Sequence, residues 1–99
     1  MRKFMVEREI PGVGSLSPEE LRGGACTSND ALAKLAPRIQ WQFSFVVADK
    51  TFCVYLAEDE AVIGEHAELS GFPANRITEI SGVIDPSTSR NSTTTTRTT

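Results

Sequence analysis

The chain has 99 residues, of which 39% are hydrophobic and 23% are charged, and this composition is that of an ordinary globular domain. A net charge of -3, with lysine and arginine scattered along the chain, gives no electrostatic reason to expect nucleic acid binding. No apolar run approaches the roughly 20 residues that a membrane helix needs, and no signal-peptide core follows Met1, so we expect a cytoplasmic protein.

The first predicted element is a strand over residues 3–10, because its residues alternate in character and successive side chains of a strand point to opposite faces. Phe4 and Val6 lie on one face, and Met5, Glu7 and Glu9 lie on the other. A segment rich in proline and glycine, residues 11–14, then ends the strand.

A helix is predicted to start at Ser17, with Pro18 in its first position and Glu20 placed to complete a capping box. It should run to about Leu35, since Pro37 cannot continue it. The glycine pair at positions 23 and 24 costs roughly 1 kcal/mol per residue relative to alanine, so the first turns can be irregular. The expected buried residues are Leu21, Ala25, Ser28, Leu32 and Leu35.

Residues 39–57 form a predicted hairpin at the centre of the domain. Parity places Ile39, Trp41, Phe43, Phe45 and Val47 on one face of the first strand. A two-residue loop at Asp49 and Lys50 would pair Val47 with Phe52, Phe45 with Val54 and Phe43 with Leu56. This register keeps every one of those apolar residues on a single face, and a slip of one residue would mix the faces.

The acidic residues Glu58, Asp59 and Glu60 favour the start of a second helix. Its apolar face is expected to hold Val62, Ile63, His66, Ala67 and Leu69, with Gly71 as its end. The last strand is predicted over residues 76–85, with a bulge or bend at Gly82. Residues 87–99 are mostly serine and threonine and have no apolar anchor, so we expect a disordered tail after a single domain over residues 1–86.

The order of strand, helix, strand, strand, helix and strand predicts an α+β fold of the ferredoxin-like βαββαβ type. In this fold a four-stranded antiparallel sheet carries both helices on one face. The other face is open, and in so small a domain an open apolar face invites a partner. We therefore expect a twofold homodimer, with no membrane and no nucleic acid partner.

His66 is the only histidine and lies on the helix face that we expect to be buried. It is either a core histidine bonded to a carbonyl or a group that binds a transition metal or transfers protons. No second strong ligand stands beside it on the helix, so further ligands must come from strands. Glu7, Cys53 and Tyr55 are the candidates, if the first and third strands are parallel neighbours and Glu7 shares a face with the other two.

Two arrangements of the sheet remain open. If the aromatic face of the hairpin packs on the helices, Cys53 and Tyr55 point away from His66. In the opposite phase the aromatic face forms the dimer interface, and His66 lies over a polar cavity lined by Cys53, Tyr55 and Glu7. Hydrophobic burial favours the first arrangement, and a binding function needs the second or a site shared between subunits.

Several segments resemble a bacterial family of short proteins of unknown function, some members of which are called nickel-binding proteins. The resemblance covers about residues 3–86, and its most specific part is Gly71-Phe72-Pro73-Ala74-Asn75. It implies a ferredoxin-like dimer and possible nickel binding, with no established enzymatic activity. The other matching segments are residues 7–12, 39–41, 49–50, 53–55, 65–67 and 83–86, with Ser44 and Ala57.

The leading functional hypothesis is a homodimer that binds a divalent transition metal, plausibly nickel, through His66 with Glu7, Cys53 and Tyr55 as further ligands. The alternative is a small-molecule binding module or cofactor-independent enzyme of the dimeric α+β barrel type. In that case His66, Cys53 and Tyr55 would supply hydrogen-bonding or acid-base groups. A large dry cavity under the second helix would favour the alternative, and we assign no catalytic residue.

Overall fold

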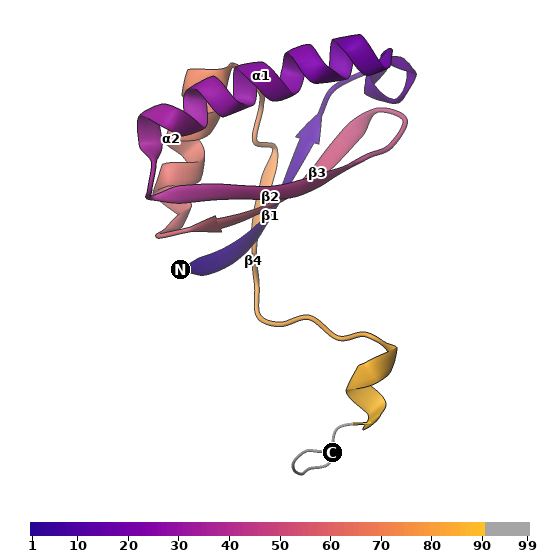
Figure 1. The fold of residues 1–99 in the computed structure, drawn as a ribbon, viewed down its shortest axis with the longest axis vertical. Coiled ribbons are helices and arrows are strands. Elements are labelled where there is room, and N and C mark those ends of the chain that lie inside the picture. The colour runs from indigo at the N-terminus through magenta and orange to yellow at the C-terminus, as the bar shows by residue number, and fades with distance from the viewer. Residues whose placement is uncertain (91–99) are drawn as a thin grey trace.

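The computed structural model describes residues 1–90, which form a four-stranded antiparallel sheet with two helices on one of its faces (Figure 1). The strand order is β2-β3-β1-β4. The predicted α+β class and element order are confirmed, and the arrangement is consistent with a ferredoxin-like fold. The elements are β1 (Arg2–Glu9), α1 (Pro18–Leu35), β2 (Ile39–Val46), β3 (Lys50–Ala57), α2 (Glu60–Ser70) and β4 (Arg76–Ile80), with short 3-10 helices at Val13–Ser15 and Pro86–Arg90.

Capping residues define the start of both helices and the end of α2. In α1 the Glu20 backbone N–H donates to Ser17 Oγ at 3.1 Å, and Glu20 Oε1 accepts from the Ser17 N–H at 2.9 Å, which completes the predicted capping box. Asp59 caps α2 by accepting from the Val62 N–H at 3.0 Å. Gly71 ends α2 at φ +79°, a left-handed conformation that glycine adopts without steric cost.

The hairpin register differs from the prediction by two residues. Phe45 pairs with Phe52 and Phe43 with Val54, and the Val47 N–H donates to the Lys50 carbonyl at 3.0 Å. The two loop residues are therefore 48 and 49, rather than 49 and 50. Hydrogen bonds from outside the hairpin account for this turn, and parity within the hairpin cannot reveal them.

Residues 10–14, which follow β1, form hydrogen bonds with the β2–β3 turn. The Ile10 N–H donates to the Asp49 carbonyl and the Gly14 N–H to the Ala48 carbonyl, both at 3.0 Å. The Gly12 N–H donates to Asp49 Oδ1 at 2.9 Å. A Cβ on Gly14 would lie 2.8 Å from Ala48 Cα, so only glycine allows this close approach. The turn position is thus fixed by contacts with residues 10–14.

A β-bulge divides the predicted aromatic face of β2. Trp41 pairs with Tyr55, yet Phe43 pairs with Val54, so β2 advances two residues where β3 advances one. Trp41 consequently faces the helices, whereas Phe43 and Phe45 point to the open face and are 51% and 57% exposed. The expectation that these side chains all share one face is wrong, because the extra residue inverts the alternation.

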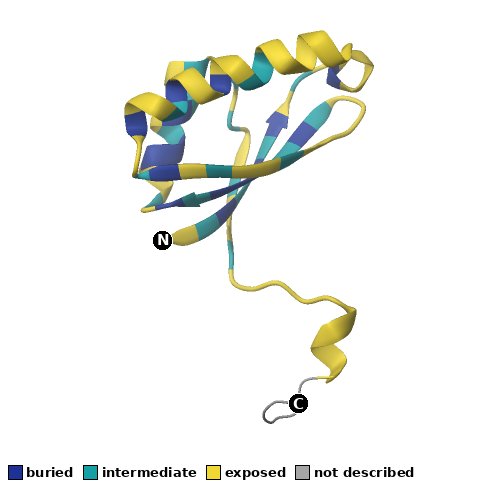
Figure 2. Cartoon of the chain, viewed as in Figure 1, coloured by how far each residue is buried: buried dark blue, intermediate teal, exposed yellow. Residues whose placement is uncertain are grey.

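Of the two arrangements left open by the sequence, the structure agrees with the second in the placement of Cys53 and Tyr55 beneath the helices, but not in that of Glu7, which lies on the open side. Cys53 and Tyr55 pack under the helices, and the aromatic side chains of residues 43, 45 and 52 lie on the opposite face. The buried positions concentrate on the inner sides of the helices and the central strands (Figure 2). The core consists of Phe4, Val6, Leu35, Ile39, Cys53, Tyr55, Ala57, Val62 and Ile63.

The last strand is shorter than predicted. β4 ends at Ile80, so Gly82 lies beyond the strand and residues 81–85 extend away from the sheet (Figure 1). Residues 86–90 form a 3-10 helix, and the remainder of the predicted tail, residues 91–99, lies outside the described residues. In residues 1–90 neither helix combines the length and apolar character needed to cross a membrane.

Candidate functional site

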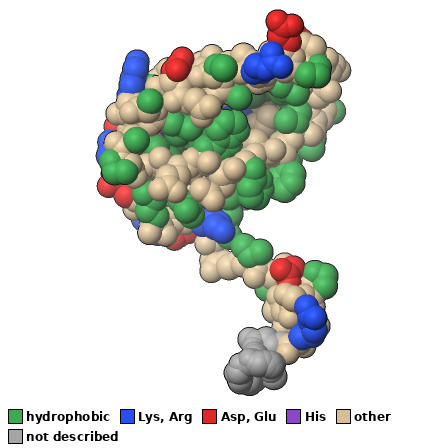
Figure 3. Space-filling model, in the orientation of Figure 1, with side chains coloured by type: hydrophobic (Ala, Val, Ile, Leu, Met, Phe, Trp, Pro, Cys, Tyr) green, Lys and Arg blue, Asp and Glu red, His purple; other side chains and the backbone are tan. Residues whose placement is uncertain are grey.

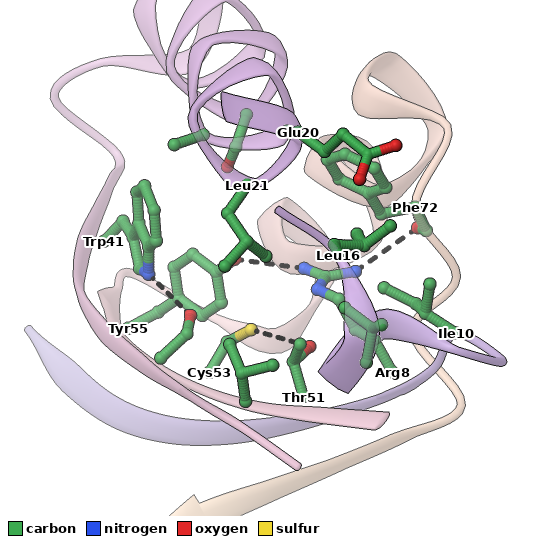
Figure 4. Close-up of a pocket in the computed structure, with 16 residues that line it drawn as sticks. Arg8, Ile10, Leu16, Glu20, Leu21, Trp41, Thr51, Cys53, Tyr55 and Phe72 are labelled. Carbon is green, nitrogen blue, oxygen red and sulfur yellow. Dashed lines mark hydrogen bonds between the residues drawn. The ribbon is translucent and has the colours of Figure 1, made fainter. Parts of the chain in front are cut away.

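A cavity of about 290 Å³ lies between α1 and the helix-covered face of the sheet (Figure 4). Its volume is close to the lower end of the roughly 300–1,000 Å³ range of small-molecule sites. On this side of the molecule hydrophobic side chains gather below α1 and along the hairpin (Figure 3). The apolar walls come from Ile10, Val13, Leu16, Leu21, Ala25, Trp41, Val46 and Phe72, and the polar residues are Arg8, Glu20, Ser28, Ser44, Thr51, Cys53 and Tyr55.

Arg8 lies on the floor of this cavity and is only 2% exposed. It follows Phe4 and Val6 in the alternation of β1, so its side chain enters the core. Nη1 donates to the carbonyls of Phe72 at 3.2 Å and Pro73 at 2.8 Å, and Nη2 donates to the Tyr55 hydroxyl at 3.1 Å. Within residues 1–90, no carboxylate forms an ion pair with this guanidinium. A buried charge in such surroundings is costly unless something compensates it.

His66 supports Arg8 from α2. The imidazole is fully buried, with Nδ1 3.4 Å from Arg8 Nη2 and Nε2 3.2 Å from Ser28 Oγ. Because a guanidinium can only donate, Nδ1 must accept, and the ring proton therefore sits on Nε2 and is donated to Ser28. Burial lowers the pKa of His66 below 6.5, and the Arg8 charge lowers it further. The neutral imidazole is thus the form that the site favours.

Tyr55 connects the histidine to the cavity. Its ring centroid is 5.6 Å from that of His66 and 5.8 Å from the Arg8 guanidinium carbon. Burial raises the pKa of the Tyr55 hydroxyl, and the Arg8 charge opposes that change. The phenol is therefore protonated at neutral pH. Beside it, Cys53 Sγ lies 3.4 Å from Thr51 Oγ1, and Trp41 Nε1 donates to Ser44 Oγ at 2.9 Å.

The predicted ligand residues do not all meet. Cys53, Tyr55 and His66 lie on the helix-covered side of the sheet, but Glu7 pairs with Phe52 on the open side. The expectation that Glu7 shares a face with Cys53 and Tyr55 is wrong, because β1 and β3 are antiparallel and their register pairs Val6 with Cys53. Glu7 instead lies 3.7 Å from the Lys50 ammonium.

These residues fit a divalent cation poorly within one subunit. Both ring nitrogens of His66 already have partners, and a metal at Nδ1 would lie beside the positive guanidinium of Arg8. Across residues 1–90, no three His, Cys, Asp or Glu side chains form a group that could hold a metal ion. The metal-binding role of His66, Glu7, Cys53 and Tyr55 stays a prediction.

The Ser28–His66 pair also fits nucleophilic catalysis poorly. A serine nucleophile needs a histidine whose other nitrogen is oriented and made more basic by a carboxylate. Here that nitrogen meets the cation of Arg8, which lowers its basicity. The network is suited to holding Arg8 and Tyr55 in place, rather than to accepting a proton from Ser28.

Arg8 is the residue that sequence reasoning missed. A signal was present, because positions 4, 6 and 8 share one face of a strand and the first two are apolar. A charged residue at such a position is ordinarily assigned to solvent. Its carbonyl partners come from the Phe72-Pro73 segment after α2, and nothing in the sequence links that segment to residue 8.

A solved crystal structure shares the fold of this chain. The crystal structure of SCO4226 from Streptomyces coelicolor A3(2) matches with a TM-score of 0.66 at 16% sequence identity, over 83% of this chain and 99% of that chain. No curated protein matches the chain. The family model described as "Nickel responsive protein SCO4226-like" matches residues 4–80, which include both helices and all of the sheet except the first two residues of β1. The chain belongs to this SCO4226-like family of nickel responsive proteins.

Proposed function

We propose that this protein binds a small, largely apolar organic molecule in the cavity between α1 and the sheet. The observation that supports the proposal is the cavity itself, whose apolar walls surround a few fixed polar groups in the way that ligand sites do. Leu16 and Leu21 are each 37% exposed on the α1 side of the cavity, where they can cover an apolar ligand. Binding explains the site better than catalysis does, because no activated nucleophile or base is present among its described residues.

The neighbouring glycines of α1 provide a matched test. Gly24 lines the cavity, and a Cβ on it would lie 3.9 Å from the Phe72 ring, whereas a Cβ on Gly23 meets nothing within 4 Å. Gly24→Leu should therefore fill the cavity, and Gly23→Leu should place the same side chain in open space. Both substitutions change helix propensity equally.

The neutral dye N-phenyl-1-naphthylamine is a suitable probe, since its fluorescence rises in apolar sites. We expect wild type and Gly23→Leu to bind it equally, and Gly24→Leu to lose at least about tenfold in affinity, or about 1.4 kcal/mol. A Phe45→Ser variant should retain binding, because Phe45 lies on the opposite face of the sheet. Loss of binding in Phe45→Ser, with full binding in Gly24→Leu, would move the ligand to the open face and refute the proposal.

We also propose that the open face of the sheet forms a homodimer interface. Phe43 and Phe45 pack edge to face at 5.3 Å between ring centroids, and more than half of each side chain is exposed. Exposed aromatic groups of this kind mark contact surfaces. The apolar residues of this face are Met5, Phe43, Phe45, Phe52, Val54, Leu56 and Ile80. A monomer at micromolar concentration, measured by size-exclusion chromatography with light scattering, would contradict this.

Nickel binding is the second candidate function, and membership of a nickel responsive family favours it. Within one subunit Arg8 and Ser28 already occupy the two nitrogens of His66, so ligands from a second subunit or a rearranged His66 would be required. Glu7 could take part only from the open face. Calorimetric titration of the tag-free protein with nickel, beside His66→Ala, tests this candidate. Equal affinity in both proteins, or none in either, would remove His66 as a ligand.

A further inference from the structure

The cavity contains a positive charge for which the described residues provide no negative partner. All four N–H groups of the two Arg8 terminal nitrogens are directed at neutral acceptors: two carbonyls, the Tyr55 hydroxyl and His66 Nδ1. The fifth donor, Nε–H, forms no hydrogen bond with any residue in 1–90. Arg8 is nevertheless buried, with only 2% of the residue exposed to solvent. This is the arrangement expected of a site whose counter-charge arrives with a ligand.

The neighbouring hydroxyls are also left as donors. Tyr55 accepts from Arg8, and Ser28 accepts from His66 Nε2, so each hydroxyl keeps its own proton. The Tyr55 proton has only the thiol of Cys53, a weak acceptor, within hydrogen-bond reach, and the Ser28 proton has no acceptor among the described residues. Both hydroxyls belong to residues that line the cavity, and Tyr55 lies beside the guanidinium (Figure 4). The floor therefore offers a ligand one positive charge, two donors without an acceptor, Arg8 Nε–H and the Ser28 hydroxyl, and the weakly engaged hydroxyl of Tyr55.

The chain's own acidic group near the cavity does not neutralise Arg8. Glu20 contributes to the lining, but it is exposed, and its Oε1 accepts from the Ser17 N–H at 2.9 Å in the capping box. No ion pair within 4.0 Å joins Glu20 to Arg8. Glu20 is thus committed to the start of α1.

We propose that the ligand is an organic monocarboxylate, an inference that rests on the proposed binding function. Its carboxylate contacts Arg8 and the Tyr55 hydroxyl, and its apolar body lies against Leu16, Leu21 and Trp41. A single cation within largely apolar walls suits one negative charge. A phosphate dianion would need further charged donors to offset its desolvation. His66 is a positioning residue here, because its Nδ1 holds the guanidinium from the side of α2.

The direct test compares two probes of the same size, 3-phenylpropanoate and 3-phenylpropanamide, by isothermal titration calorimetry at pH 7.5. The carboxylate should bind wild type at least about tenfold more tightly, as expected for a charge-assisted hydrogen bond in a buried site. Arg8→Gln should remove this preference while leaving amide binding in place, and Arg8→Lys should restore part of it. Tyr55→Phe should lower the preference several-fold.

The outcomes separate this inference from the binding function beneath it. Equal affinity for both probes in wild type would overturn the carboxylate proposal and leave binding intact, whereas binding of neither probe would overturn both for ligands of this size. If Arg8→Gln fails to fold, the wild-type probe pair and Tyr55→Phe still decide.

Discussion

The two faces of the sheet use their side chains in opposite ways. The helix-covered face buries an arginine, a histidine and a tyrosine that are joined by hydrogen bonds, while the open face leaves Phe43 and Phe45 more than half exposed. Hydrophobic burial alone would have reversed this assignment. Exposed aromatic groups on one face and a buried charge on the other indicate that each face has its own function. We infer a contact surface on one face and a ligand site on the other.

The largest expected difference between the faces is in stability. His66→Ala should destabilise the fold by about 3 kcal/mol, because it opens a cavity and leaves Arg8 and Ser28 without a partner. Phe43→Ala on the open face should cost less than about 1 kcal/mol at concentrations where the protein is monomeric. Urea unfolding followed by circular dichroism measures both. Equal losses would show that the two faces contribute alike.

The next effect concerns association. Phe45→Ser should raise the dimer dissociation constant at least about tenfold, because it removes a large exposed aromatic side chain from the open face. Thr27→Ala is a suitable control, since Thr27 is exposed on α1, away from that face. Sedimentation velocity over a concentration series gives the constants. An unchanged constant in Phe45→Ser would place any interface elsewhere.

The smallest effect is a pH dependence that belongs only to the helix-covered face. Burial and Arg8 lower the pKa of His66 below 6.5, so the unfolded chain takes up a proton before the folded one does. The free energy of unfolding should therefore be unaffected by His66 above pH 6.5 and should fall as the pH decreases from 6.5 towards the folded-state pKa. Comparing wild type with His66→Asn at pH 7.5 and 5.5 isolates this contribution. An identical change in both proteins would contradict it.

Local signals in the sequence predicted the elements well. The capping box at Ser17 and Glu20, and the end of α2 at Gly71, act within a few residues, and the structure has both. The faces of the hairpin could not be predicted in this way. One extra residue between Trp41 and Phe43 inverts the alternation, and nothing in the pattern of apolar residues marks it.

The candidate site could be predicted only in part, because its residues are brought together by contacts between distant parts of the chain. His66, Cys53 and Tyr55 were selected for their chemistry, and all three lie on the helix-covered side. The prediction for Glu7 is wrong because the antiparallel register of β1 with β3 pairs Val6, and not Glu7, with Cys53, and this register cannot be derived from either strand alone. Arg8 was missed because its burial depends on two carbonyls and a hydroxyl that come from distant positions in the chain. Such partners are known only once the fold is known.

We infer that an anionic ligand binds on the helix-covered face at Arg8. Nuclear magnetic resonance tests it most directly, by following the Arg8 Nε–H and the Trp41 indole N–H during titration with 3-phenylpropanoate. We predict that both signals shift with the carboxylate, and that the Arg8 signal shifts much less with 3-phenylpropanamide. Shifts confined to Phe43, Phe45 and their neighbours on the open face, with the Arg8 signal unmoved, would contradict the claim.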